Sequence, residues 1–321
     1  MSNATKPPAK TLTIDGHKIV IGHPDRVYFP DAGYTKMQTL SYYARVAPLM
    51  AQRTKSRPIV LRRYPEEISK DGFLADGIGK QGFFQKRVGS YYPDWIPRAV
   101  QPISNGTLEY ALGGEAAALV WLANLGTIEF HAMLNRADRP NRPDQIIFDL
   151  DPPIDYSDGV RLAALGLKAI CDDLGLTAFV KSTGSRGFHV IVPIARYYDF
   201  DQTRSFAKLL ATRLMQKQPG KLSLDMRKAS REKRILVDVW RNGYGQTAVA
   251  PFSLRARPGA PVAVPLKWSD LQSPEIHPRA VTLGNFAEHE ARARCAWPAK
   301  LGPSGRIEKA WRALGGESLR A

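Results

Sequence analysis

The stretch QIIFDLDPP, Gln145–Pro153, places two carboxylates in an otherwise apolar segment that is typical of a β-strand. Because side chains of a strand alternate between its two faces, Asp149 and Asp151 point to one side, while Phe148 and Leu150 point to the other. Like charges in a half-buried strand repel each other and resist desolvation. The pair therefore requires a compensating cation or a polar rim.

A third acid, Asp238, lies in the apolar stretch ILVDVW, which also reads as a strand. If this strand lies beside Gln145–Pro153, three carboxylates converge, and such a set suits hard divalent cations such as Mg²⁺ or Mn²⁺. Two ions would stabilise the attacking and leaving oxygens of a phosphoryl transfer. The alternative is that Asp149 and Asp151 cap the following turn and that Asp238 pairs with an arginine such as Arg241.

A second motif, KSTGSRGFHV, contains two glycines that permit a tight turn with backbone N–H groups facing an anion. Ser182, Thr183, Ser185 and Arg186 add hydroxyl and guanidinium donors. The turn lacks the GxxxxGK[ST] spacing of a P-loop, so no ordinary ATPase is implied. His189 could donate to a phosphate oxygen, although a single strand histidine is more often structural, and the same applies to His131.

A third motif, SLRARPG, places Arg255 and Arg257 on one face of a segment that reads as strand-like. Two parallel guanidinium groups suit triphosphate oxygens, which accept bidentate hydrogen bonds. The alternative is a pair of solvated surface arginines.

The composition favours a polyanionic partner and a reducing compartment. The chain has 321 residues, with 46 Lys and Arg against 30 Asp and Glu, and a formal net charge of +16. Its two cysteines, Cys171 and Cys295, have no CxxC partner, which argues against a disulfide scaffold or a cysteine zinc cluster. No apolar run approaches the length of a membrane span, and the N-terminus lacks a secretory signal. We expect a cytoplasmic protein with no membrane partner.

The order of elements is mixed. The Asp15-Gly16 dipeptide predicts a hairpin turn, and a helix is expected from Thr35 onward. A strand, a helix from about Glu115 and a second strand ending near His131 follow. From Gln145 the pattern is strand, helix, strand, turn and strand. Further helices are expected over about 203–215 and after Phe286. A long surface excursion of the chain is expected over 69–81.

Four motifs in this order, FDLDPP, STGSRGFHV, ILVDVWRNG and TAVAPFSLRARPGAPVAVPL, resemble the polymerase domain of bacterial DNA ligase D, in the archaeo-eukaryotic primase superfamily. The resemblance extends from HPDRVYFPDAGYTK to PVAVPLKW. It implies an α+β primase-polymerase fold, with an RRM-like antiparallel catalytic sheet and helices packed against an N-terminal α/β module. We expect a flexible leader over 1–10, a primase-polymerase domain over 11–300 and a helical tail over 301–321. The N-terminal module would span about 11–135 and the catalytic module about 136–290.

The resemblance also assigns roles in the active site. It implies that two Mn²⁺ or Mg²⁺ ions bind the catalytic carboxylates Asp149, Asp151 and Asp238. It places His131 near the nucleotide sugar, and it implies that the triphosphate of an NTP or dNTP meets Thr183, Arg186, His189, Arg241, Arg255 and Arg257. Thr183 stands where the family usually has serine, and Arg186 where lysine is common.

On the DNA side, the resemblance implies a pocket for a downstream 5′-phosphate at Arg26 and Lys36. Lys36 in a first helical turn, beside free helix N–H groups, would make a phosphate cradle. Phe83 and Phe84 would stack against DNA at the break, with core packing as the alternative. Lys228 and Arg231, in a basic loop, would position template or primer ends.

The activity implied is that of a DNA-directed DNA/RNA polymerase, a nucleotidyltransferase that adds ribo- or deoxyribonucleotides at gapped or broken DNA ends during repair. The expected partners are such DNA, especially with a 5′-phosphate, and by family Ku and a DNA ligase, in a bacterial, nucleoid-associated setting. No ligase or nuclease module occurs in these 321 residues, which favours an excised domain or a stand-alone polymerase. A primase that starts chains without a primer and a catalytically idle DNA-end binding module remain as alternatives.

Overall fold

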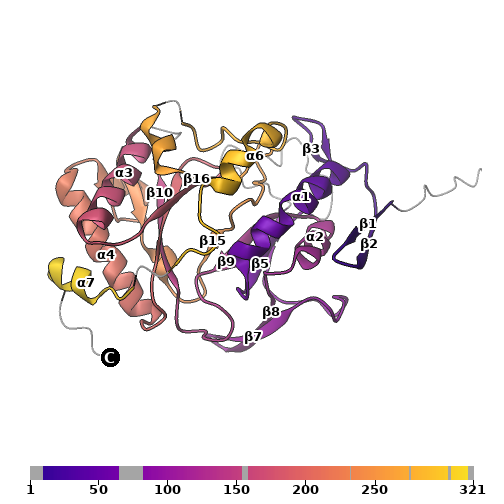
Figure 1. Cartoon of the computed structure of the whole chain (residues 1–321), viewed down its shortest axis with the longest axis horizontal. Coiled ribbons are helices and arrows are strands. Elements are labelled where there is room, and N and C mark those ends of the chain that lie inside the picture. The colour runs from indigo at the N-terminus through magenta and orange to yellow at the C-terminus, as the bar shows by residue number, and fades with distance from the viewer. Residues whose placement is uncertain are drawn as a thin grey trace, which may run out of the picture.

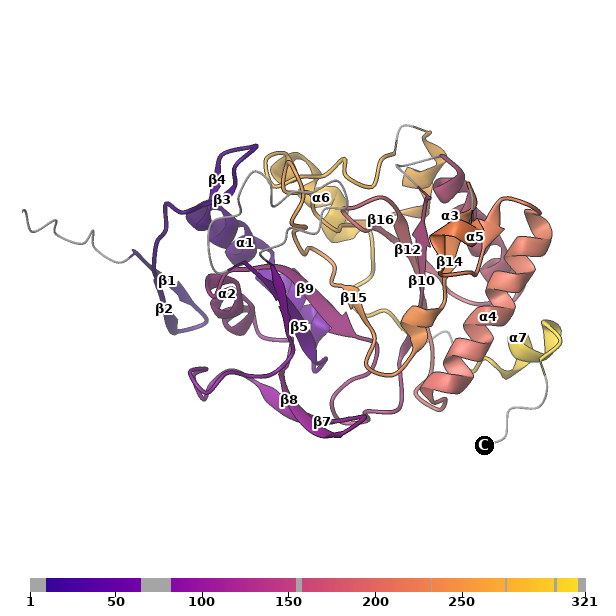
Figure 2. The ribbon, with the colours of Figure 1, turned by 180° about the vertical axis from the view of Figure 1, so that it is seen from behind.

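The computed structural model describes residues 10–64, 82–153, 158–231, 233–274, 276–302 and 305–316. Within these residues the strands form a six-stranded sheet, a four-stranded sheet and three two-stranded hairpins. Helices cover the outer sides of the two larger sheets (Figures 1 and 2). The α+β class expected from the sequence is confirmed.

The six-stranded sheet is antiparallel except at one edge, where β13 and β14 are parallel. In spatial order its strands are β13 (Leu222–Ser223), β14 (Ile235–Asp238), β10 (Gln145–Asp151), β12 (Phe188–Pro193), β11 (Phe179–Ser182) and β16 (Pro265–Leu266). Helices α3 (Asp158–Asp173) and α4 (Phe200–Lys217) pack over one face of it. Phe148 and Leu150 are fully buried in the core. Because of strand alternation, Asp149 and Asp151 point to the opposite face.

The four-stranded sheet supports the N-terminal part of the molecule. Its strands, in spatial order, are β15 (Thr247–Val249), β9 (Thr127–Met133), β5 (Ile59–Arg63) and β6 (Phe83–Gln85). Helices α1 (Lys36–Thr54) and α2 (Ala116–Asn124) lie over it and pack against each other (Figure 1). The edge strand β15 comes from the second half of the chain, so the two halves share this sheet.

Helix α1 begins where the sequence predicts. Thr35 is its N-cap, and the Thr35 hydroxyl accepts the N–H of Gln38, while the Gln38 side chain accepts the N–H of Thr35. This reciprocal pair is a capping box. The recurring apolar residues Leu40, Tyr43, Ala47 and Met50 are buried beneath the helix.

The remaining elements are short. The hairpins are β1 (Lys10–Ile14) with β2 (His17–Ile21), β3 (Val27–Phe29) with β4 (Tyr34–Thr35), and β7 (Arg98–Ile103) with β8 (Gly106–Ala111). The remaining helices are α5 (Lys228–Arg231), α6 (Phe286–Cys295), α7 (Glu308–Ala313) and 3₁₀ helices over Trp240–Asn242 and Trp268–Gln272. Asp15 and Gly16 have φ of 48° and 81°, which confirms the predicted hairpin turn. No helix in the described segments combines the length and apolarity that crossing a bilayer requires.

The segment with Arg255 and Arg257 is not a strand: Phe252 and Ala260 have φ of 66° and 51°, which interrupt an extended backbone, and only an isolated bridge joins Leu254 to Val262. The strand-like interpretation was therefore wrong. The predicted excursion over 69–81 lies outside the described residues.

Candidate active site

A cavity of about 420 Å³ lies between the two larger sheets, and we call it the central cavity. Both sheets contribute to it, together with the turn after β11 and the segment around Arg255. The predicted site residues that line it are Phe84, His131, Asp149, Asp151, Thr183, Arg186, His189, Arg241, Arg255 and Arg257. Residues more than 170 positions apart are thus brought to one space.

A second cavity of about 420 Å³ lies on the other side of Ala248 and Val249. Asp144 is the carboxylate among the described residues that line it, and it already forms ion pairs with Arg57 and Arg136. The carboxylates whose charges require a neighbouring cation, Asp149, Asp151 and Asp238, lie instead in and beside the central cavity.

Asp149 and Asp238 are direct cross-strand partners on β10 and β14. Arg241 lies between them, with its Nε 3.4 Å from an oxygen of Asp149 and 3.3 Å from an oxygen of Asp238. Asp151 lies two residues beyond Asp149 on the same face and lines the cavity. The strand register therefore brings the acids together. Asp238 also pairs with Arg241, as the alternative interpretation of the sequence predicted.

The three carboxyl groups are buried close enough together to repel one another. Burial and repulsion by Asp149 raise the pKa of Asp151 to about 6, and the same two causes raise the pKa of Asp238. Although burial opposes it, contact with His189 and Arg241 holds the pKa of Asp149 below its ordinary value. Raised carboxyl pKa values mean that a further cation would be favourable here.

Carboxylate oxygens are the ligands that Mg²⁺ and Mn²⁺ prefer, so the donor set fits such an ion. Among the described residues, however, no group of three or more His, Cys, Asp or Glu side chains is arranged to hold a metal ion. The Arg241 Nε lies within 3.4 Å of both Asp149 and Asp238. Metal binding there requires Arg241 to move aside.

A row of polar side chains continues across the sheet from Asp149. His189 on β12 is its cross-strand partner, and Lys181 on β11 is the partner of His189. The His189 Nε2 lies 3.3 Å from Asp149 Oδ1. Burial and the charge of Lys181 lower the pKa of His189 to about 4, so the ring is neutral near pH 7. A neutral ring with an Nε2–H directed at Asp149 orients that carboxylate; a phosphate contact by His189 stays a prediction.

The predicted phosphate-contacting turn lies directly against the acidic strand. A Cβ on Gly187 would stand 1.7 Å from the Leu150 carbonyl oxygen, so only glycine permits this approach. The Thr183 hydroxyl donates to the Gly187 carbonyl at 2.9 Å and accepts the N–H groups of Ser185 and Gly187. Thr183 thus holds the turn closed. Its predicted contact with a triphosphate would have to compete with these bonds.

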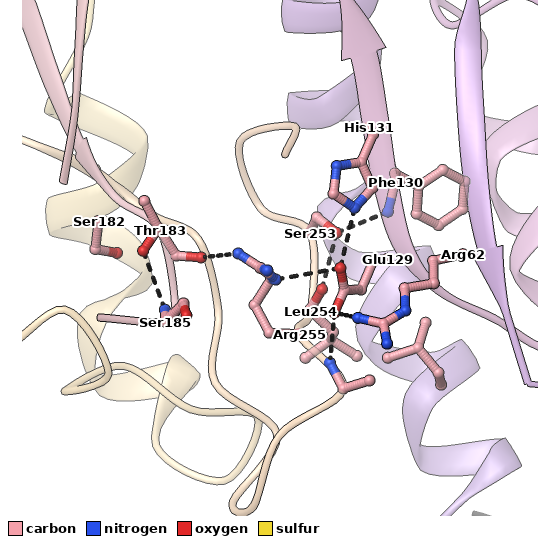
Figure 3. Close-up of polar contacts among 12 residues, drawn as sticks. Arg62, Glu129, Phe130, His131, Ser182, Thr183, Ser185, Ser253, Leu254 and Arg255 are labelled. Atoms are coloured by element: carbon pink, nitrogen blue, oxygen red, sulfur yellow. Dashed lines mark hydrogen bonds and ion pairs between the residues drawn. The ribbon is translucent and has the colours of Figure 1, made fainter. Parts of the chain in front are cut away.

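Glu129, which the sequence analysis missed, is the central anion of the opposite wall (Figure 3). It lies on β9 and forms ion pairs with Arg255 and Arg62, while His131 donates to it. The signal was present in TIEFH, because an acid two residues before a histidine shares its strand face. Nothing in the sequence indicated its arginine partners, which come from distant segments. Burial and neighbouring Arg255 lower the pKa of Arg257 to about 10.

The residues of the predicted 5′-phosphate pocket lie at the start of α1. Lys36 is 8% exposed and donates to the Gly22 carbonyl at 2.9 Å. Burial, with a smaller effect of nearby Arg26, lowers the pKa of Lys36 to about 8. The two cations are thus close enough to repel, which is favourable for binding an anion.

The backbone of this pocket differs from the expectation. The N–H groups of Lys36 and Met37 donate to the carbonyls of Arg26 and Pro24 at 2.7 Å and 2.8 Å. The third N–H of the helix is taken by its cap. The prediction of free helix N–H groups was therefore wrong, because the preceding loop folds back over the helix end. A phosphate would rely on the side chains of Arg26 and Lys36.

Phe83 and Phe84 are 46% and 57% exposed, so the alternative of core packing is wrong. They lie on β6 opposite Arg63 and Arg62, whose guanidinium groups sit 5.6 Å from the Phe83 and Phe84 ring centroids. Phe84 also meets the His131 ring edge to face, at 5.5 Å between centroids. Exposed aromatic rings beside arginines suit stacking on nucleic-acid bases.

The two residues of the basic loop are in or at the short helix α5. The Lys228 side chain lies outside the described part of the structure. Arg231 is only 6% exposed, and its Nε is buried without a hydrogen-bond partner among the described residues. A contact of Arg231 with DNA stays a prediction, and it requires α5 to rearrange.

Comparisons with known proteins agree with the geometry. Residues 35–297 match the family described as LigD, primase-polymerase domain. The multifunctional non-homologous end joining proteins LigD of Pseudomonas aeruginosa and Mycolicibacterium smegmatis are 32% identical over 255 residues and 28% identical over 266 residues. These alignments cover 79% and 81% of this chain but 29% and 33% of the relatives, so the chain spans about a third of their length.

A solved structure, the polymerase domain from Mycobacterium tuberculosis ligase D in complex with DNA, is similar with a TM-score of 0.76 at 27% identity. The similarity covers 87% of this chain and 99% of that chain. Together these matches confirm the resemblance drawn from the four motifs and the primase-polymerase fold that it implied.

Proposed function

Since the chain belongs to the family of LigD primase-polymerase domains, we propose that it adds nucleotides to DNA ends in template-dependent repair. The observation that supports this most is the central cavity, where the Asp149 and Asp151 carboxylates of β10 face a wall of arginines. Carboxylates suit divalent cations and the arginines suit a triphosphate. The cavity thus combines the two kinds of site that nucleotidyl transfer needs.

In this proposal Asp149, Asp151 and Asp238 hold two Mg²⁺ or Mn²⁺ ions. Once bound, these ions would supply charge neutralisation of the triphosphate and activation of an attacking 3′-hydroxyl. The protein contributes orientation: His189 fixes Asp149, and Arg255 and Arg257 lie where they can contact phosphate oxygens. His131 is the candidate contact for the sugar of an NTP or dNTP.

The DNA would approach from the side of β6 and the start of α1. Phe83 and Phe84 offer exposed rings for bases at the break, and Arg26 with Lys36 offers two cations for a 5′-phosphate. The M. tuberculosis polymerase domain of similar fold is described as a complex with DNA. The relatives are described as non-homologous end joining proteins, and on that ground we propose Ku and a DNA ligase as partners.

The decisive experiment is extension of a primer on a gapped duplex with Mn²⁺ or Mg²⁺ and either NTPs or dNTPs. We expect template-directed, metal-dependent extension that is stronger when the gap has a 5′-phosphate. A single-stranded template without primer separates this activity from that of a primase. Binding of gapped DNA without incorporation under any of these conditions would identify a DNA-end binding module and contradict the proposal.

A further inference from the structure

The carboxylate of Glu129 is buried and fully surrounded. The residue is 1% exposed on β9, at the boundary between the four-stranded sheet and the central cavity. Its Oε1 accepts the backbone N–H of Ala256 at 3.1 Å and lies 3.3 Å from Arg62 Nη1. Its Oε2 lies 3.0 Å from His131 Nε2 and 3.3 Å from Arg255 Nε (Figure 3). Each oxygen therefore has two partners.

This environment argues against a metal-ligating role for Glu129. A metal ion would have to replace contacts that already satisfy both oxygens. Although burial opposes ionisation, Arg255 and the hydrogen bond from His131 hold the Glu129 pKa well below its ordinary value. The residue is a permanent internal anion, and its partners are the groups that face the cavity.

Arg255 is fixed at two points by this arrangement. Its Nε pairs with Glu129, and its Nη1 donates to the Thr183 carbonyl at 2.8 Å. The Nε contact is an ion pair without hydrogen-bond geometry, whereas the Nη1 contact is a hydrogen bond. Because a guanidinium is planar, the two contacts together restrict the direction of the third nitrogen. Among the described residues, the hydrogen bond and ion pair of Arg255 use Nη1 and Nε, so Nη2 is the nitrogen available to a ligand in the cavity that Arg255 lines. Without Glu129, Arg255 would be a largely buried cation with no counterion.

His131 is fixed by the same carboxylate. Burial lowers the pKa of His131, so its ring is predominantly neutral near pH 7. Since a carboxylate accepts only, the neutral ring must carry its proton on Nε2, and Nδ1 is then an acceptor. Figure 3 shows Nδ1 on the side of the ring away from Glu129. A group that donates to His131, such as a hydroxyl, can therefore bind on the cavity side.

We infer that Glu129 is a positioning residue for the nucleotide, acting through Arg255 and His131 rather than by contact with substrate. This inference rests on the proposed function, because it assigns Glu129 to the nucleotide site of that reaction. Glu129 contacts both Arg255, which would bind phosphate, and His131, which would face the sugar. One buried charge therefore fixes the orientation of both side chains.

The test is Glu129→Gln, which keeps the side-chain shape and removes the charge. We expect the KM for the nucleotide to rise about tenfold, with smaller changes in kcat and in the Kd for gapped DNA, because Glu129 reaches the predicted DNA residue Phe84 only indirectly, through Arg62 and His131. The matched control is Glu290→Gln. Glu290 is also a buried carboxylate paired with two arginines, Arg45 and Arg294, but it lies on α6 and does not line the cavity. Glu290→Gln should leave the KM for the nucleotide unchanged.

A double-mutant cycle distinguishes positioning from general destabilisation. In an Arg255→Gln background, Glu129→Gln should raise the KM less than about twofold, since its main route of action is gone. An equal rise in both backgrounds, or no rise in either, overturns the inference. ¹⁵N NMR of His131 provides a second readout: an unchanged Nε2–H tautomer signature in Glu129→Gln would contradict the part that concerns the histidine.

Two further measurements keep the outcome decisive. If Glu129→Gln does not fold, Glu129→Asp retains the charge but withdraws the carboxylate by one methylene, and it should still weaken nucleotide binding. Equilibrium binding of ATP with Mg²⁺ tests Glu129 without relying on turnover. Failure of the wild-type chain to extend gapped DNA would contradict the proposed function, whereas normal ATP affinity in both Glu129 variants would contradict this inference alone.

Discussion

Asp149 and Asp238 face each other across the antiparallel pair β10 and β14, and the Nε of Arg241 lies within 3.4 Å of both carboxylates. An internal cation thus neutralises the two acids that we propose as metal ligands. It compensates them only in part, since the pKa of Asp238 is still raised by burial and by Asp149. A divalent ion would compete with Arg241 for the same oxygens.

Replacement of either acid should abolish catalysis but leave DNA binding intact. For Asp149→Asn and Asp238→Asn we expect at least about a 1,000-fold loss of extension rate, because charge stabilisation by a metal is worth several kcal/mol. The Kd for gapped DNA, measured by fluorescence anisotropy, should stay near the wild-type value. Asp144→Asn, which removes another carboxylate paired with arginines, is the control. Substantial extension by either active-site variant would refute the metal assignment.

Asp151→Asn should stabilise the protein in the absence of metal. The Asp151 pKa is raised to about 6 by burial and by Asp149, so its ionised form disfavours the folded state. Below about pH 4 the carboxyl group is protonated whether folded or unfolded, and the variant should match the wild type. The gain should appear between about pH 4 and 6 and reach about 1–3 kcal/mol above that range. Denaturant unfolding at pH 3.5 and pH 7.5, without metal, measures it.

Discrimination for a 5′-phosphate should weaken as the pH rises from 7 to 9. Burial and Arg26 lower the Lys36 pKa to about 8, so the free protein loses this charge well below the ordinary lysine range. A bound phosphate favours the protonated form, which makes phosphate binding dependent on pH. The Kd for a gap without a 5′-phosphate, divided by the Kd for a gap with one, should fall over this interval. Lys36→Ala should abolish the pH dependence, and the exposed Lys208→Ala should preserve it.

Phe84→Ala should weaken binding at the break by about 1–3 kcal/mol, the usual contribution of one base stacked on an aromatic ring. Because the ring is 57% exposed, the thermal stability of the free protein should change little. Tyr197→Ala removes a similarly exposed ring, 60% accessible, that does not line the central cavity, and it serves as the control. Equal losses of DNA affinity in both variants would contradict a specific stacking role.

The sequence was sufficient where the signals are local. Alternation in QIIFDLDPP predicted both the strand and the common face of Asp149 and Asp151, and the glycines of STGSRG predicted the turn. The helix expected from Thr35 onward is α1, which begins at Lys36 with Thr35 as its cap. These features depend on neighbours within a few positions, so no tertiary information is needed to find them.

The remaining features depend on contacts between distant segments. Arg241 reaches both acids only because β14 pairs with β10 in one register, and Glu129 meets the backbone of Ala256 across 127 positions of the chain. Arg231 is buried although it lies in a basic stretch, and a loop rather than a phosphate satisfies the first N–H groups of α1. Charge and spacing could not reveal these, because tertiary packing decides them. The assigned domain boundaries stay a prediction.

The pairing of β15 with β9 constrains how such a chain can be divided or recombined. A fragment that ends before residue 136 would expose the open edge of β9, an unpaired template for self-association. The second half, expressed alone, would leave its short strand without a neighbour. We therefore expect the two halves to be inherited, fused and engineered as one unit. Chimaeras between relatives should fold only when β9 and β15 come from the same parent.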